Sequence, residues 1–222
     1  MNQKMAHFAG LAYGDGYPGR AEIRVVTALP DFADKLLGLT QDLADVYKAT
    51  CRVNVRPGNI SDNPQYTITL TSTLLRRALF DDSLLPRYDA IHAIAMEQDL
   101  AADFQGGLSD AEGSLHLPEE IECPHGRIFA AVNSDRRLLG IARLALVYKL
   151  RLEPGSVSTR LSSKRGRIHT LRGHEIVTRK NSYLIEILAG AKKKWLTSVG
   201  RLLWHPEKQR RAKILLATFG SG

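Results

Sequence analysis

The chain has 222 residues, 44% hydrophobic and 24% charged, a composition typical of globular proteins with a hydrophobic core, and its net charge is +8. It has neither the roughly 20-residue apolar run of a membrane span nor the apolar stretch of a secretory signal peptide, so we expect no membrane partner. Two cysteines are too few for a disulfide scaffold and indicate a reducing compartment, the cytoplasm or an organelle matrix, rather than secretion.

The first hundred residues predict an alternation of helices and strands. Apolar residues from Phe32 to Leu43 recur three and four positions apart, as in an amphipathic helix, whereas Val53 and Val55 alternate with polar residues, as in a strand. In chain order we predict a helix over 4–14, a turn over 17–20, a strand over 22–27, a helix beginning at 31, strands over 51–56 and 66–71, and helices over 73–80 and 86–96.

The second half of the chain predicts the same order of elements. After a second short helix near residue 110 we predict a strand over 126–132 and a helix over 135–150 with Ser134 as its N-cap. The segment 157–188 holds two or more strands with turns near 164–166 and 172–174, and helices follow over 192–203 and 206–219. An α+β fold with two halves, 1–98 and 99–222, follows from this repetition.

Two nine-residue segments, 8–16 and 105–113, share one pattern. Aligned, they pair Gly10 with Gly107, Leu11 with Leu108, Gly14 with Ala111, Asp15 with Glu112, and Gly16 with Gly113. Small residues four apart let two helix backbones approach closely, and a final glycine provides the left-handed residue that ends a helix. Two such helices packed together place their acids side by side. Because an acid at a helix C-terminus is unfavourable against the helix dipole, its occurrence twice indicates a compensating cation.

These segments resemble the motif of the LAGLIDADG homing endonucleases, in the single-chain form with one motif in each half. The second copy, Phe104-x-x-Gly107-Leu108-x-Asp110-Ala111-Glu112-Gly113, is the closer match, and the first has Tyr13 where the motif's first acid usually stands. The resemblance implies two pseudo-symmetric αββαββα halves packed through the motif helices, forming a saddle of antiparallel sheets over DNA. It also implies a monomer that cuts both strands of a long recognition site and leaves short 3′ overhangs.

In this family the motif's last acid binds a divalent metal together with the preceding main-chain carbonyl. Carried onto this chain, the catalytic residues are Asp15 and Glu112, and the metal ligands are these acids with the carbonyls of Gly14 and Ala111. Such oxygen ligands suit Mg²⁺, with Mn²⁺ or Ca²⁺ able to occupy the same sites. We expect Asp110 to be a hydrogen-bond acceptor at the helix end rather than a ligand.

One departure concerns the group that activates water. Family members often carry Gln or Lys at the end of the strand after the motif, and the corresponding segments here are 28–30 and 132–134. Asn133 is the residue there that we expect to assist the acids, and Lys180 and Lys149 are further candidates for water activation. The departure favours an alternative, an RNA maturase that helps an intron to splice, with intron RNA as its partner and with cleavage weakened or lost.

Charge distribution indicates a nucleic-acid partner. Residues 1–100 hold ten basic and twelve acidic side chains, whereas residues 101–222 hold twenty-one and eleven. We predict a phosphate contact at Lys192–Lys194. At outward strand positions we predict base contacts, and the alternative is that these side chains form a solvated sheet face without a partner. The candidate DNA-binding residues are Arg20, Arg24, Arg52, Asn54, Arg56, Gln65, Thr67, Thr69, Arg127, Arg160, Lys164, Arg165, Arg167, His169, Arg179 and Lys180. A third hypothesis, a DNA-binding regulator, predicts the loss of one acid, and both acids are present.

Overall fold

The computed structural model describes residues 2–57, 64–121, 123–171 and 174–219, with side chains except at 169–171 and 174–176. Its α-helices are α1 (Gln3–Asp15), α2 (Pro30–Tyr47), α3 (Thr73–Leu79), α4 (Tyr88–Ala95), α5 (Ala101–Glu112), α6 (Pro118–Ile121), α7 (Arg136–Leu144), α8 (Ala189–Ser198) and α9 (Pro206–Ala217). A π-helical turn, η1 (Ala145–Lys149), and two 3₁₀ turns, η2 (Pro154–Ser156) and η3 (Gly200–Leu202), lie between them. None of the described helices is long and apolar enough to cross a membrane.

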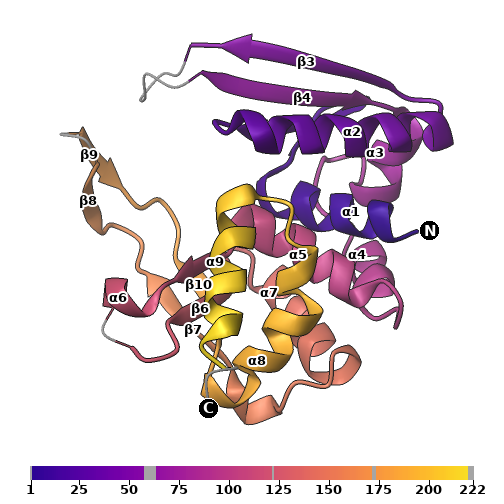
Figure 1. Ribbon diagram of the computed structural model, residues 1–222. Coiled ribbons are helices and arrows are strands. Elements are labelled where there is room, and N and C mark those ends of the chain that lie inside the picture. The colour runs from indigo at the N-terminus through magenta and orange to yellow at the C-terminus, as the bar shows by residue number, and fades with distance from the viewer. Residues whose placement is uncertain (1, 58–63, 122, 172–173, 220–222) are drawn as a thin grey trace.

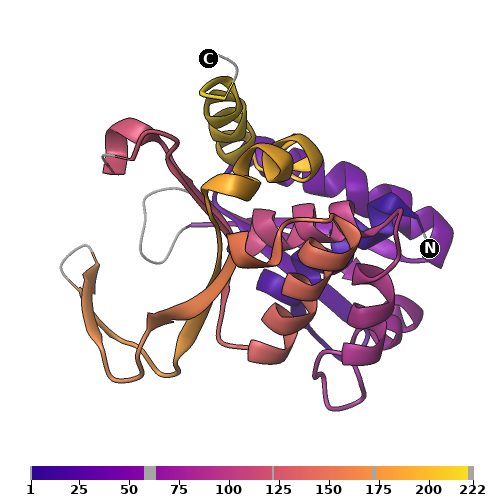
Figure 2. The ribbon, with the colours of Figure 1, turned by 90° about the horizontal axis from the view of Figure 1, so that it is seen from below.

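Two four-stranded antiparallel sheets share one topology, which confirms the predicted α+β fold. The strands are β1 (Tyr17–Pro18), β2 (Glu22–Thr27), β3 (Thr50–Arg56), β4 (Gln65–Thr71), β5 (Ser114–His116), β6 (Arg127–Asn133), β7 (Val157–Ser163), β8 (Ile168–Leu171), β9 (His174–Val177) and β10 (Ser182–Ile187). The first sheet has the order β1-β2-β4-β3 and the second the order β5-β6-β10-β7. Strands β8 and β9 form a hairpin that projects from the body of the protein (Figures 1 and 2).

Helices α1 and α5 lie side by side at the centre of the molecule (Figure 1). Their backbones nearly touch at the glycines of the repeated pattern. A Cβ atom on Gly10 would lie 2.2 Å from the carbonyl oxygen of Phe104, and one on Gly107 would lie 1.9 Å from that of His7. Only glycine fits at these two positions, so the predicted close approach of the two helices is confirmed.

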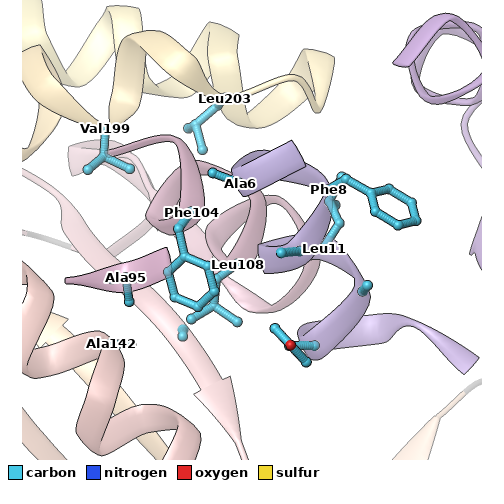
Figure 3. Close-up of a cluster of buried hydrophobic side chains, with 14 of the residues drawn as sticks. Ala6, Phe8, Leu11, Ala95, Phe104, Leu108, Ala142, Val199 and Leu203 are labelled. Atoms are coloured by element: carbon cyan, nitrogen blue, oxygen red, sulfur yellow. The ribbon is translucent and has the colours of Figure 1, made fainter. Parts of the chain in front are cut away.

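The core surrounds this helix pair. Leu11 of α1 and Phe104 and Leu108 of α5 are at most 1% exposed, and Figure 3 shows them packed in one cluster with Ala95 and Ala142. Residues of the C-terminal segment, including Val199 and Leu203, close the cluster from the other side (Figure 3). Burial of this apolar surface holds the two helices in one arrangement.

Several local predictions were wrong. Gly16 and Gly113 are extended rather than left-handed, with φ of −76° and −83°. Glycine is required at Gly16 because a Cβ there would lie 2.3 Å from the carbonyl oxygen of Ala12. The predicted turn over 17–20 contains the short strand β1, and the predicted helix over 135–150 changes to a π-helical turn after residue 144.

Two predictions about polar side chains were also wrong, one for a helix N-cap and one for a phosphate contact. The N-cap of α7 is Asp135 rather than Ser134, because the Asp135 carboxylate accepts hydrogen bonds from the amides of Arg137 and Leu138. Lys192 is buried and its ammonium donates to the carbonyl oxygen of Gly126 at 2.6 Å, while Lys194 donates to that of Arg151 at 2.8 Å. Both lysines therefore bind main-chain oxygens of this chain, and the predicted phosphate contact loses two of its three groups.

Candidate functional site

The C-terminal ends of α1 and α5 bring Asp15 and Glu112 together. The two helix ends are in contact, because a Cβ atom on Gly14 would lie 2.5 Å from Cβ of Ala111 and 2.9 Å from Cγ of Glu112. Asp15 is exposed and Glu112 is half-buried. The repeated pattern thus places one carboxylate of each half at one end of the helix seam.

Both carboxyls are disfavoured in their ionised form. Burial, followed by the repulsion of Asp15, raises the pKa of Glu112 to about 7, against opposition from Asn133 and Lys208. Although Asp15 is exposed as a residue, the surrounding protein removes part of the water from its carboxyl and so raises its pKa, and the charge of Lys208 opposes this shift. Two neighbouring acids that resist ionisation are stabilised by a cation placed between or beside them.

Asn133, at the end of β6, binds directly to Glu112. Its amide nitrogen donates to Oε1 of Glu112 at 2.7 Å, and its Oδ1 accepts from the amide of Asp135 at 2.8 Å. This side chain is thereby fixed at both ends, and it holds the Glu112 carboxylate in one orientation.

Lys208 of α9 is a residue of the site that the sequence did not reveal. Its ammonium donates to the carbonyl oxygens of Ser109 at 2.9 Å and Asp110 at 2.5 Å, in the last turn of α5. Burial lowers the pKa of Lys208, while Asp110, Asp15 and Glu112 oppose that shift. Lys149 and Lys180, the lysines favoured from the sequence, are not among the charges that shift either acid's pKa.

Asp110 anchors the C-terminal segment that carries Lys208. Its carboxylate is buried and accepts hydrogen bonds from the amides of Trp204 at 2.6 Å and His205 at 3.1 Å, and Nε2 of His7 lies 3.1 Å from it. His205 in turn caps α9 by accepting from the amide of Lys208 at 3.3 Å. Asp110 is therefore a hydrogen-bond acceptor, as expected.

The outer face of the first sheet forms a polar groove of about 550 Å³. Seven of the eight DNA-binding candidates from the first half line it: Arg24, Arg52, Asn54, Arg56, Gln65, Thr67 and Thr69. The eighth, Arg20, is exposed in the turn that precedes β2. The side chains expected to share one face of this sheet do so.

The candidates of the second half fall into two groups. Arg127 and Arg160 lie on the second sheet, where both pair with Glu186. The others lie on the arm, residues 164–180, which contains the β8–β9 hairpin. Exposed basic side chains along it are Lys164, Arg165, Arg167, Arg179 and Lys180. The side chain of His169 lies outside the described residues.

The residues available to hold a metal are few. Within the described ranges, no three His, Cys, Asp or Glu side chains come together as a metal-binding group. A divalent cation at the seam would therefore depend on two carboxylates and on main-chain oxygens, an all-oxygen donor set of the kind that Mg²⁺ accepts.

Comparison with known proteins identifies the fold. No protein-family model matches the sequence, and no curated protein matches it. A single-substitution variant of I-DmoI, in complex with its target DNA in the presence of 2 mM Mg, superposes with a TM-score of 0.52 at 18% identity, over 89% of this chain and 95% of that chain. The homing endonuclease I-WcaI bound to its DNA recognition sequence superposes with a TM-score of 0.58 at 10% identity, over 94% of this chain and 86% of that chain. Across nearly its whole length, this chain has the fold of two LAGLIDADG homing endonucleases.

Proposed function

We propose that this chain is a homing endonuclease that cuts both strands of DNA at a specific site. In this proposal it acts as a monomer, with halves 1–98 and 99–222 related by pseudo-symmetry. The observation that carries the proposal is the pair Asp15 and Glu112, one acid from each half, at the end of a seam in which the glycines leave no room for a side chain. The DNA-bound state of both similar structures supports the same conclusion.

The uncovered faces of the two sheets would bind the duplex. Helices cover one face of each sheet (Figures 1 and 2), and on the other face of the first sheet polar side chains line a groove. Arginine and lysine on these faces and on the arm would neutralise phosphates, which supplies most of the affinity that does not depend on sequence. Amide, hydroxyl and guanidinium groups of the strands would contact base edges in the major groove.

The acid pair fits a divalent cation such as Mg²⁺. Asp15 and Glu112 would hold it with the carbonyl oxygens of Gly14 and Ala111. The ionised carboxylates are disfavoured by loss of water and, at Glu112, by repulsion from Asp15, and they would gain the counter-charge that they lack. Bound Mg²⁺ supplies charge stabilisation at a phosphodiester and a lower pKa for an attacking water. One acid per half matches one cut per strand, and we propose that the two cuts leave short 3′ overhangs.

Two further side chains would support the reaction. Asn133 orients Glu112 through its 2.7 Å hydrogen bond. Lys208 spends two of its three N–H donors on main-chain oxygens of α5, so one remains for a phosphate oxygen or a water. Its charge beside the acids supplies the basic group missing from the strand ends. Because the lack of such a group favoured the maturase alternative, a lysine at this place supports the nuclease proposal.

Mapping of DNA ends tests the proposal. Genomic DNA from an intron-free relative of the source organism is incubated with the protein and Mg²⁺, with an EDTA sample as control, and new ends are located by sequencing. We expect recurrent paired ends with short 3′ overhangs at one or a few sites. Ends no more frequent than with EDTA, together with tight binding to intron RNA, would replace the nuclease with the maturase.

A further inference from the structure

An acid lies at the centre of the second sheet's uncovered face. Glu186 is on β10, between β6 and β7, opposite Phe129 on one side and Ser158 on the other. Its side chain is 13% exposed. On a surface that approaches phosphates, a carboxylate repels the ligand and reduces affinity, so its presence requires another explanation.

Glu186 holds two of the candidate DNA-binding arginines. Nη2 of Arg160 lies 2.8 Å from its Oε2, and Nε of Arg127 lies 3.9 Å from its Oε1. The Arg160 guanidinium also lies over the ring of Phe129, 6.0 Å from the centroid. The ring of His116 packs edge-on against the same phenylalanine, with centroids 5.4 Å apart. Arg160 is thus oriented from the side by a carboxylate and from below by a packed aromatic ring.

The two arginines are oriented without being covered. The side chains of Arg160 and Arg127 remain 50% and 51% exposed. The first sheet differs, because in the part of the chain that the structure describes, Arg52 and Arg56 of its groove have no ion-pair partner. Arg24 of the first sheet pairs with Glu22 in that groove. On the second sheet, by contrast, one central carboxylate holds two arginines from the strands on either side of it.

Orientation matters for base contacts more than for phosphate contacts. A phosphate attracts a cation from any direction, whereas guanine is recognised by two parallel hydrogen bonds from one guanidinium to O6 and N7. An arginine that is already oriented loses less rotamer entropy when it makes that contact. The cost in affinity of an acid on this face is therefore offset by discrimination between bases.

We infer that Glu186 is a specificity-determining residue, which fixes Arg160 for contact with a guanine in the half of the target that the second sheet covers. The inference rests on the proposed function, since it requires a duplex on this face. It assigns Glu186 a positioning role, and Arg160 makes the contact with DNA.

Selection from a randomised duplex pool, followed by sequencing of the bound fraction, tests the inference. For Glu186→Gln we expect the wild-type guanine preference to fall by about tenfold at one or two adjacent positions, within the range that one bidentate arginine–guanine contact provides. At the same time, affinity for random DNA should rise, and its log–log salt dependence should steepen by roughly 0.9 for each arginine that turns to a phosphate.

Two further variants separate this role from a structural one. Arg160→Lys keeps the charge but loses the planar fork, so it should lose the same guanine preference with unchanged affinity for random DNA. Glu97→Gln, an exposed acid after α4, removes the same charge away from the sheets and should change neither quantity. Unchanged base preference in Glu186→Gln, or altered positions that differ from those of Arg160→Lys, would overturn the inference. A wild-type protein that selects no sequence would instead refute the proposed function.

Discussion

Substitution of Gly107 by alanine tests the helix seam at its tightest point. The added Cβ would lie 1.9 Å from the carbonyl oxygen of His7 and 3.0 Å from the amide nitrogen of Leu11. A carbon atom normally stays about 3.3 Å or more from a carbonyl oxygen, so these two atoms must move apart by roughly 1.4 Å, the difference from 1.9 Å. Both contacting atoms belong to the backbone, so no side-chain rotation relieves the clash.

The expected cost follows from overpacking. Separation of α1 from α5 disturbs a cluster of fully buried side chains, and overpacking of such a core costs about 1–3 kcal/mol or more. For a chain of this size that is a fall in Tm of roughly 2–12 °C. Thermal unfolding monitored by circular dichroism measures it.

Gly38→Ala is the matched control for this substitution. Gly38 is exposed in α2, and a Cβ there meets nothing within 4 Å. Replacement of a helical glycine by alanine without a clash stabilises by about 0.5–1 kcal/mol, so Tm should rise. The same chemical change should therefore have opposite signs at the two positions. A Gly107→Ala protein that melts at or above the wild-type temperature would refute the close-packed seam.

Three further predictions concern the site and the DNA surface. Burial raises the folded-state pKa of Glu112 from 4.5 to about 7, so between these pH values the native state binds more protons than the unfolded state. The free energy of unfolding, measured by chemical denaturation, should therefore decline as pH rises from 4.5 to 7, and it should decline less for Glu112→Gln. Lys208→Met should slow cleavage by roughly 10²-fold with little loss of DNA affinity, because it removes a charge that stabilises the reacting phosphate. Lys213 is exposed on the same helix, so Lys213→Met should cleave at the wild-type rate, and equal cleavage rates for the two variants in gel assays would remove Lys208 from the site. Combined Arg165→Ala and Lys180→Ala on the arm should flatten the log–log salt slope of binding by roughly 0.9 per lost phosphate contact, and an unchanged slope would mean that the arm does not contact DNA.

Local patterns in the sequence predicted most of the elements. The strand over 22–27 has the predicted bounds, the strand predicted from the alternation at Val53 and Val55 is β3, and the paired glycines predicted the contact between α1 and α5. These signals succeed because period and side-chain size act within one element or between two elements with the same pattern. The prediction that Gly113 is left-handed was wrong. Glycine is required there because a Cβ atom would lie 2.6 Å from the carbonyl oxygen of Ser109, not because of the backbone conformation.

The parts that the sequence did not predict depend on contacts between distant segments. Lys208 meets the last turn of α5 in a segment that Asp110, about a hundred residues earlier, anchors through the amides of Trp204 and His205. A hydrogen bond between a side chain and a distant backbone leaves no periodic trace. Glu186 was missed for a similar reason, because its partners come from β6 and β7, and only the strand register brings the three side chains together.

The central claim is that Asp15 and Glu112 form a single cleavage site. The direct measurement uses a DNA fragment that contains a site cut by the wild-type protein, and follows linear product and binding in parallel for Asp15→Asn and Glu112→Gln. We expect each substitution to abolish double-strand cleavage and to leave DNA affinity within about tenfold, because binding depends on phosphate contacts elsewhere. Linear product at the wild-type rate from either variant would contradict the claim.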